Sequence, residues 1–470
     1  MEIPSLVGHC SEVIRIILKS HQPPDLILSQ YLRSKKYIGS FDRRFISELV
    51  FFFLRIKSLP DYILNVIVNS GTYDDHSDET IIKDSLLILL VLIQQNLLIC
   101  KANSVISQPN EDQFLKLFIT SNLVEKELSI NNFIDFKNSV CHLFQELNLE
   151  IESNFFVKDQ EKIDKIGIRY GQQSWIVDKL INKYHPNYNE LAVFFNSFLE
   201  PSPLTIRVEN KADLSIIQEH FLHIEIETTL CNFSPVALHL NKRLDLNTVP
   251  LYKSGRFEVQ DEGSQLISFA LDPQPGDSIL DACAGAGGKS MHIASLQHDS
   301  GRIVSCDVEL SKLRELNKRS ARCGYKSIET VLDHNLEKLD ETFSKVLIDA
   351  PCTGMGTIRR NPIPKWRLTE EYLSKHIVKQ DKILDYYSKF VEPGGELIYS
   401  TCSILPDENE FVIERFLSNH KEFEPLALMP SFKSHGIDIP DLGKSDYQLQ
   451  LLPSKHGCDG FFMAKLQRKD

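Results

Sequence analysis

The spacing of apolar residues divides the chain into a helical first part and an alternating last part. Residues 40–56, SFDRRFISELVFFFLRI, repeat apolar side chains at helical spacing, and Ser40 or Asp42 is expected to cap this helix. Similar spacing from residue 1 to about 150 predicts an all-helical bundle. The longest apolar run, Leu86–Ile93, is far shorter than the roughly 20 residues of a membrane span, so it predicts a buried core helix.

Strand-like and helical segments alternate in the last part of the chain. Helices are expected over 288–297, from Ser311, and from Thr369 to Val391, where Pro393-Gly394-Gly395 ends the helix. This alternation predicts the α/β class, with a parallel sheet covered on both faces. The strand-like segments are SIL (278–280), RIVSCDV (302–308), SIETVLD (327–333), KVLIDAPC (345–352) and ELIYSTC (396–402).

These patterns predict three domains. Residues 1–150 are expected to form the all-helical domain. Residues 151–265, which include the strand-like LTIRV, are expected to form a linker and a small α/β subdomain. Residues 266–470 are expected to carry the parallel sheet and the chemistry.

Composition and cysteine usage indicate the compartment. The chain is 42% hydrophobic and 25% charged, which is typical of a soluble globular protein. No secretory signal is visible, and the ten cysteines include no CxxC pair and no Cys/His cluster at metal-ligand spacing. We therefore expect a cytoplasmic monomer that contacts no membrane and holds no metal.

The net charge of −12 gives no general basic surface for nucleic acid. Two segments are locally basic. Residues 312–326 carry six basic side chains against one acid, and residues 358–367, IRRNPIPKWR, carry no acid at all. Either segment alone is an ordinary solvated surface, so both gain weight only if they flank a site.

The loop DACAGAGGKS, residues 281–290, resembles two phosphate-binding loops and matches neither. Cys283 takes the place of the first glycine of a Walker A loop, and the glycine spacing also departs from the dinucleotide pattern. Ligands of parallel sheets bind beyond the carboxyl ends of the strands. Acids follow four of the strands and thiols follow two, although each alone could be a turn residue or a buried thiol: Asp281, Asp307, Asp333, Asp349, Cys352 and Cys402.

These acids favour a cationic ligand. They would repel a nucleoside triphosphate, whereas a nucleoside that carries a sulfonium suits them, and Asp307 is placed to accept hydrogen bonds from a ribose. The sequence thus favours S-adenosylmethionine over ATP or NAD. The thiols suit methylation of carbon 5 of cytosine, because a thiolate added at carbon 6 makes carbon 5 nucleophilic.

Four segments closely resemble the Sun/RsmB (Fmu) family of RNA cytosine-5 methyltransferases: DACAGAGGKS, VLIDAPCTGMGTIRRNPIPKW, YSTCSILPDENE and HGCDGFFMAKL. The resemblance covers about residues 200–470, and more faintly the first part, which resembles the NusB-like RNA-binding bundle of the bacterial branch. It implies a class I (Rossmann-like) methyltransferase fold, S-adenosylmethionine as the donor and RNA, ribosomal RNA above all, as the partner.

The resemblance also assigns roles to residues. It implies that Cys402 is the nucleophile, that Cys352 helps to resolve the adduct, and that Asp349 lies against the target base. Gly285-Ala286 departs from the Ala-Pro that is usual in the family, which should loosen the turn and leave its backbone donors available. The implied cofactor contacts are Cys283, Ala284, Gly285, Ala286, Gly287, Gly288, Lys289, Asp307, Asp333 and Asp349.

With a site between them, the basic segments become candidates for RNA contact. Arg359, Arg360, Lys365 and Arg367 could meet RNA phosphates beside a flipped base, with Trp366 as a stacking face or a core anchor. Three alternatives stay open. They are a P-loop NTPase that uses Lys289 and magnesium, an inactive RNA-binding or ribosome assembly factor, and a DNA cytosine-5 methyltransferase, in which Cys352 would attack.

Overall fold

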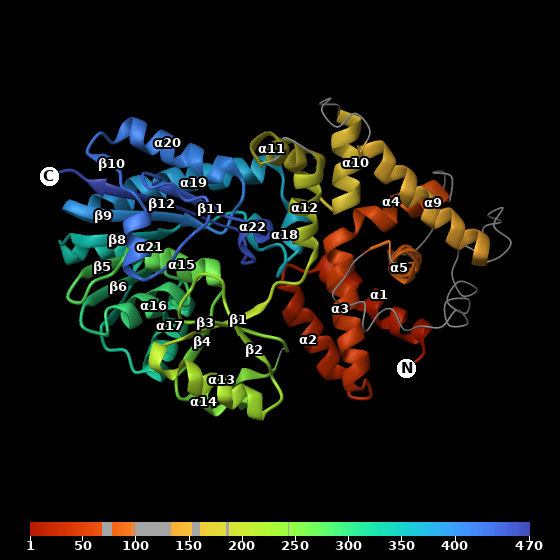
Figure 1. Ribbon diagram of the computed structural model, residues 1–470, viewed down its shortest axis with the longest axis horizontal. Helices are drawn as coiled ribbons and strands as arrows, with labels where there is room; N and C mark the ends of the chain where they lie inside the picture. The colour runs from red at the N-terminus through yellow and green to blue at the C-terminus, as the bar shows by residue number, and fades with distance from the viewer. Residues whose placement is uncertain (68–77, 96, 99–132, 153–159, 185–187, 243) are drawn as a thin grey trace. The chain divides into compact units, whose positions relative to one another are not determined.

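The protein is described by a computed structural model that covers residues 1–67, 78–95, 97–98, 133–152, 160–184, 188–242 and 244–470. The chain divides into two compact units (Figure 1). The helical unit comprises Met1–Pro201 and Ile358–Arg367, and the sheet unit comprises Ser202–Thr357 and Leu368–Asp470. The domain borders at residues 150 and 265 stay a prediction.

The helical unit is built from amphipathic helices that bury their apolar sides. Helix α3 (Ser40–Ile56) confirms the helix predicted over 40–56, and α5 (Asp78–Gln94) contains Leu86–Ile93, which is buried as predicted. The expected cap is wrong, because α3 follows Gly39 without a capping side chain. The other helices are α1 (Ile3–Lys19), α2 (Pro24–Ser34), α4 (Ser58–Ile67), α9 (Phe133–Glu152), α10 (Gln160–Tyr170), α11 (Ser174–Tyr184), α12 (Tyr188–Leu199) and α18 (Ile363–Arg367). Among the described helices, none has the length and hydropathy needed to cross a bilayer.

Two cations of the basic segment 358–367, Arg359 and Lys365, are buried in the helical unit, which corrects their proposed contact with RNA. For Arg360, which is half-buried, and Arg367, which is exposed, that contact stays a prediction. Arg359 and Lys365 are 5% and 2% exposed. The Lys365 ammonium donates to the Arg55 carbonyl at 2.5 Å, and the Trp366 indole donates to the Leu54 carbonyl at 2.7 Å. The Lys365 and Trp366 side chains thus donate hydrogen bonds to backbone carbonyl groups at the end of α3, and Trp366 anchors this segment to the helix. The two buried cations are not phosphate ligands.

The sheet unit begins with a small antiparallel sheet of order β2-β3-β1-β4. Its strand β1 (Leu204–Val208) confirms the strand predicted for LTIRV. Helix α13 (Leu214–His223) packs Ile217 and Phe221 into the apolar core of this sheet. The other elements are β2 (Thr228–Leu230), β3 (Ala237–Leu240), α14 (Pro250–Lys253) and β4 (Phe257–Val259).

The large sheet confirms the predicted α/β class. Its order is β10-β12-β9-β8-β5-β6-β7, and β11 pairs with β12. The pairs β9-β8, β8-β5, β5-β6 and β6-β7 are parallel, while β10, β11 and β12 add antiparallel strands that the sequence did not predict. The strands are β5 (Ser278–Ala282), β6 (Arg302–Asp307), β7 (Ile328–Leu332), β8 (Phe343–Asp349), β9 (Val391–Thr401), β10 (Phe423–Pro425), β11 (Gln448–Leu451) and β12 (Phe461–Arg468).

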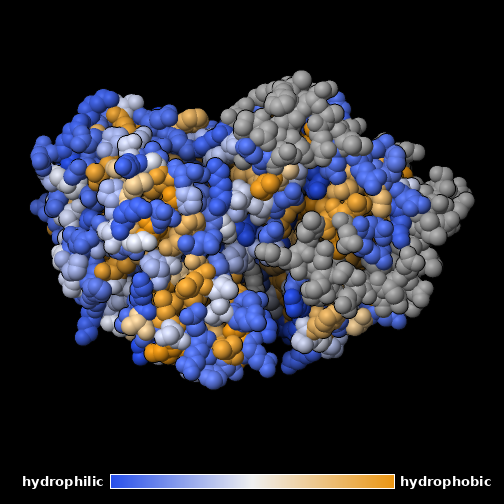
Figure 2. Space-filling view, in the orientation of Figure 1, coloured by the Kyte–Doolittle hydropathy of each residue, from blue (hydrophilic) through white to orange (hydrophobic). Residues whose placement is uncertain are grey.

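Helices cover both faces of the large sheet, as predicted (Figure 1). Adjacent residues of one strand enter different cores: Ile279 packs with α15 (Glu262–Leu271) and α16 (Gly288–Leu296), and Leu280 packs with α19 (Glu370–Tyr387) and α20 (Glu410–Asn419). Figure 2 shows mainly hydrophilic residues where α20 lies, as expected for a covering helix. The remaining helices are α17 (Leu310–Cys323), α21 (Met429–Ser434) and α22 (Pro453–His456).

The helix predicted from Thr369 to Val391 is shorter than expected. Thr369 caps it as predicted, by accepting from the Tyr372 N–H at 3.1 Å, but α19 ends at Tyr387. Pro393-Gly394-Gly395 lies inside β9, where the pairing with β8 shifts register and Gly394 has a φ of 75°. The glycines therefore form an irregular start of a strand and do not stop a helix.

Gly171 offers a test of packing in the helical unit. Its φ is 65°, and a Cβ at this position would lie 2.3 Å from the Arg55 carbonyl oxygen. We expect Gly171→Ala to lower the free energy of unfolding by about 2 kcal/mol or more. The added methyl group would collide with the Arg55 backbone, and alanine is strained at this φ. Gly8→Ala is the control, since Gly8 lies in α1 with open space at its Cβ and should gain up to about 1 kcal/mol. Denaturant unfolding of both variants measures the difference, and equal stabilities would contradict the packing.

Candidate active site

The glycine loop leaves β5 and enters α16 through a series of left-handed residues. Cys283, Gly285 and Gly287 have φ values of 61°, 58° and 81°. A Cβ at Gly287 would lie 2.3 Å from the Leu316 side chain, so glycine lets α17 pack directly on the loop. The loop is a tight turn whose shape depends on α17.

Asp307 holds the glycine loop from the end of the neighbouring strand. Its carboxylate accepts from the Gly285 N–H at 2.9 Å and from the Glu309 N–H at 2.8 Å. Ala284 donates to the Cys306 carbonyl at 2.8 Å. The expectation that the turn leaves its donors available is therefore wrong for Gly285 and Ala284. A loop with these donors engaged is a poor phosphate cradle.

A buried ion pair joins the glycine loop to the end of β8. The Lys289 ammonium lies 2.5 Å from Asp349 Oδ2, and Ser400 donates to Asp349 Oδ1 at 3.1 Å. Burial lowers the pKa of Lys289, but the attraction of Asp349, and then of Asp281 and Cys402, outweighs it and leaves this pKa raised. Lys289 is therefore a fixed cation beside Cys402, and it is already bound to a carboxylate.

The other two strand-end acids bind neighbouring hydroxyl groups. Asp281 is fully buried and accepts from Ser290 at 2.5 Å, and burial raises its pKa to about 7. Asp333 accepts from the Tyr387 hydroxyl at 2.5 Å. The predicted gathering of acids at one sheet edge is present, but Asp281 lies beneath the surface and supports α16.

Cys352 and Cys402 meet at this same edge. Their sulfur atoms are 3.3 Å apart, although the two residues are far apart in the chain, because β8 and β9 are parallel neighbours. The contact with Cys402 and burial raise the pKa of Cys352 well above its ordinary value. Cys352 thus stays a thiol near neutral pH and can share its proton with Cys402.

Glu408 is a site residue that sequence reasoning missed, although it lies in the segment YSTCSILPDENE. It is fully buried and accepts from the Thr353 N–H at 2.9 Å, from the Thr353 hydroxyl at 2.5 Å and from the Gln380 amide at 2.9 Å. Gln380 also donates to the Pro351 carbonyl at 3.1 Å. This network grips the chain on both sides of Cys352 and so positions its thiol.

The basic segment 312–326 supports the loop from within. Arg319 donates to the Ala286 carbonyl at 2.6 Å and pairs with the buried Glu258 at 2.9 Å. Arg322 pairs with Glu258 as well. These two arginines link the loop to the small sheet, so they are structural, whereas the other basic residues of the segment are exposed: Lys312, Arg314, Lys318 and Lys326.

The arrangement is suited to covalent catalysis. One thiol, Cys402, lies within the electrostatic influence of the Lys289 ammonium, and the other, Cys352, retains its proton. Carboxylates at the ends of β6, β7 and β8 surround the glycine loop. Such a site can add a sulfur to a ring carbon and bind a cationic nucleoside alongside.

The fold has counterparts among solved structures. PH0851 matches over 100% of both chains with a TM-score of 0.74 and 23% identity. NSun6 from Pyrococcus horikoshii, solved with SFG, matches over 68% of this chain and 100% of its own, with a TM-score of 0.52 and 19% identity. The sheet and these likenesses define the class as the Rossmann-like fold of methyltransferases.

Sequence comparison identifies the family within that class. The family model "16S rRNA methyltransferase RsmB/F" matches residues 268–467. The "Probable ribosomal RNA small subunit methyltransferase B" of Synechocystis sp. is 31% identical over 322 residues, which are 66% of this chain and 70% of that protein. The chain belongs to the RsmB/F family, so the resemblance seen in the sequence is confirmed.

Glu408→Gln tests the network that positions Cys352. A glutamine must turn one NH₂ group toward donors that now face a carboxylate oxygen, so we expect the free energy of unfolding to fall by about 1–3 kcal/mol. The Cys352 thiol should also react faster with an alkylating reagent, because its loop is released. Glu371→Gln, at an exposed residue of α19 that pairs with Lys375, is the control. Unchanged stability and thiol reactivity would show that Glu408 does not hold this loop.

Proposed function

We propose that this protein transfers the methyl group of S-adenosylmethionine to carbon 5 of a cytosine in ribosomal RNA of the small subunit. The observation that carries the proposal is the pair of sulfur atoms 3.3 Å apart, next to the ion pair of Lys289 and Asp349. Membership of the RsmB/F family supports ribosomal RNA as the substrate. The chemistry of the two thiols supports cytosine as the base.

The residues of the glycine loop fit S-adenosylmethionine. The left-handed turn at Gly285 has open space where a Cβ would stand, so a ligand can approach the backbone closely. Asp307 keeps lone pairs for a ribose diol, and acids dominate the surroundings, which suits a sulfonium. SFG, bound in the NSun6 structure, is an analogue of the same compound. We assign Cys283–Lys289, Asp307, Asp333 and Asp349 to this ligand.

We assign the covalent step to Cys402. Its thiolate adds to carbon 6 of the cytosine, and Asp349 lies against the base and engages its ring nitrogens. S-adenosylmethionine, when bound, supplies the methyl group that carbon 5 takes up. A water molecule in the site then takes the carbon 5 proton, and the electrons of that C–H bond re-form the double bond to carbon 6. The bond between carbon 6 and sulfur breaks, and Cys402 leaves as a thiolate that the Cys352 thiol stabilises by a hydrogen bond. The thiols thus return to their starting states.

The P-loop alternative is disfavoured by the lysine itself. A P-loop lysine must reach the β- and γ-phosphates, whereas Lys289 is buried in an ion pair with Asp349. Releasing it would leave an unpaired carboxylate in the site. The acids at the ends of β6 and β7 would in addition repel the phosphates.

The roles of the two thiols can be separated by substitution. We expect Cys402→Ala to lower methyl transfer by about 10³-fold or more and to abolish covalent RNA capture, because no sulfur attacks carbon 6. Cys352→Ala should still attack but release slowly, so a protein–RNA adduct accumulates and shows as a shifted band on a denaturing gel. Cys141→Ala, at a half-buried thiol of α9 in the helical unit, is the control. A covalent adduct formed by Cys402→Ala would contradict the assignment. Cys352 would then be the nucleophile, as the corresponding cysteine is in DNA cytosine-5 methyltransferases.

The donor can be tested without RNA. We expect S-adenosylmethionine to bind in a calorimetric titration and ATP with magnesium not to bind. Asp307→Asn should weaken the affinity about 10- to 100-fold, because an amide replaces an acceptor for the ribose and for the loop. Asp438→Asn, at a side chain 82% exposed, should bind as the parent does. Tight binding of ATP, or an unaltered affinity in Asp307→Asn, would overturn this site.

The target in RNA requires a separate experiment. Bisulfite sequencing of ribosomal RNA from cells with and without the gene reports each methylated cytosine directly. We expect one or more cytosines of the small-subunit RNA to lose their protection from bisulfite deamination in the deletion strain. The parent gene should restore this protection. A strain carrying Cys402→Ala should stay unprotected. Unchanged protection in all strains would favour the inactive assembly factor.

A further inference from the structure

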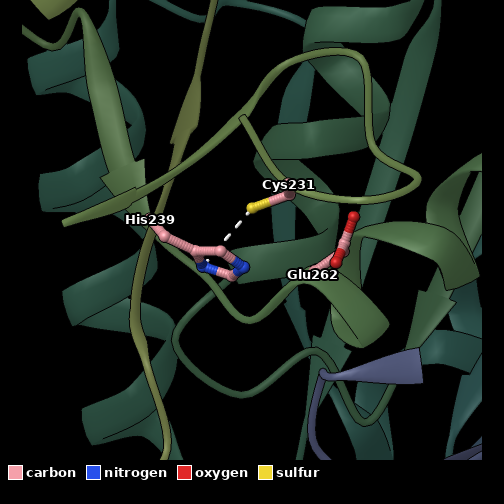
Figure 3. A group of neighbouring side chains, drawn as sticks. All are labelled: Cys231, His239 and Glu262. Carbon is pink, nitrogen blue, oxygen red and sulfur yellow. Dashed lines mark hydrogen bonds between the residues drawn. The ribbon is translucent and has the colours of Figure 1, made fainter. Parts of the chain in front are cut away.

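A second group of reactive side chains lies in the small sheet, outside the methylation site. Cys231 follows β2, His239 lies in β3 and Glu262 is the first residue of α15 (Figure 3). The antiparallel pairing of β2 with β3 sets Thr229 opposite His239, and the Cys231 N–H donates to the Ala237 carbonyl at 3.1 Å. The hairpin therefore brings a thiol and an imidazole together. The spacing of Cys231 and His239 in the sequence fits no metal-binding pattern, so no metal site was expected from the sequence.

The three side chains are close enough to share one ion. One potential ligand atom from each lies within 4.8 Å of the others, and Cys231 Sγ is 3.5 Å from His239 Nδ1. Ligands at the usual distances around tetrahedral zinc are about 3.5 Å apart, so small side-chain shifts would complete the geometry. Figure 3 shows the thiol approaching the imidazole from the hairpin and the carboxylate approaching from the helix.

Glu262 supplies the independent sign of a ligand. It is 1% exposed, and its Oε1 accepts from the N–H groups of Phe233 at 2.6 Å and Ser234 at 2.9 Å. Its Oε2 is buried and accepts no hydrogen bond within the part of the chain that the structure describes. A buried carboxylate oxygen without a partner is costly, and a cation would satisfy it. The backbone bonds orient the carboxylate in the manner of groups that support metal ligands.

The rest of the surroundings also suit a cation. Thr205 Oγ1 lies 3.0 Å from His239 Nδ1 and orients the imidazole ring, and an ion bound at this nitrogen would replace the Thr205 contact. A divalent ion would balance the thiolate and the Glu262 carboxylate together.

We propose that Cys231, His239 and Glu262 bind one divalent ion of the zinc type, with water as the fourth ligand. Sulfur, imidazole and carboxylate together match zinc better than calcium or magnesium, which prefer oxygen alone. The ion would clamp the β2–β3 hairpin to the first turn of α15. These residues take no part in the proposed methyl transfer.

Cobalt alone is the probe, added to full-length protein that has been stripped with a chelator. We expect one Co²⁺ per chain, with the visible bands of tetrahedral cobalt and a near-ultraviolet thiolate charge-transfer band. Zinc should displace the cobalt and raise the unfolding temperature. Cys231→Ser should lose the thiolate band, and affinity should fall about 10- to 100-fold. Cys141→Ser, at a half-buried thiol of α9, should keep both.

A second variant shows whether a loss of cobalt binding results from unfolding of the protein. Glu262→Gln retains an oxygen for the Phe233 and Ser234 N–H groups, so the hairpin should stay folded by circular dichroism while cobalt affinity drops. Binding of no ion at excess cobalt would overturn the proposal. A thiolate band that persists in Cys231→Ser and vanishes in Cys402→Ser would place the ion on the catalytic thiols and would overturn it as well. Neither of these outcomes depends on methyltransferase activity.

Discussion

The ion pair between Lys289 and Asp349 connects the parts of the site that arise from different strands. Lys289 belongs to the start of α16 and Asp349 ends β8, so one contact ties the glycine loop to the strand that leads to Cys352. Lys289 is buried, while the Asp349 side chain is 31% exposed, so removing Asp349 would leave a buried ammonium without its carboxylate. The pair also sets the charge next to Cys402 and keeps the lysine from other anions. Ligand selection and the charge beside Cys402 therefore rest on the same interaction.

Much of the sheet and the site was predictable because both depend on local pattern. Strands of a parallel sheet are apolar and short, and the residues directly after each strand must lie at one edge of the sheet. Asp307, Asp349 and Cys402 could thus be assigned to one site from their positions after strand-like segments, and the structure places them at the ends of β6, β8 and β9. The strand of the small sheet, LTIRV, was predicted on the same physical ground.

The remainder depends on contacts between distant residues, which leave no periodic trace. Glu408 resembles any acid in an acidic turn until the fold places it against Thr353. Pro393-Gly394-Gly395 has the composition of a helix stop, but a bulged strand tolerates it equally well. Cys231 and His239 acquire a relation only through strand pairing. Lys365 and Arg359 look like surface cations, and only tertiary packing shows that they bind backbone carbonyls.

The segment Ile358–Arg367 has a consequence for how the chain folds during synthesis. The helical unit is built from the first 201 residues together with these ten residues, which leave the ribosome only after four strands of the large sheet. Until then the carbonyl groups of Leu54 and Arg55 lack the indole and ammonium that later bind them. The N-terminal unit therefore cannot finish folding before most of the catalytic unit exists, and the two units mature together although their sequences begin apart.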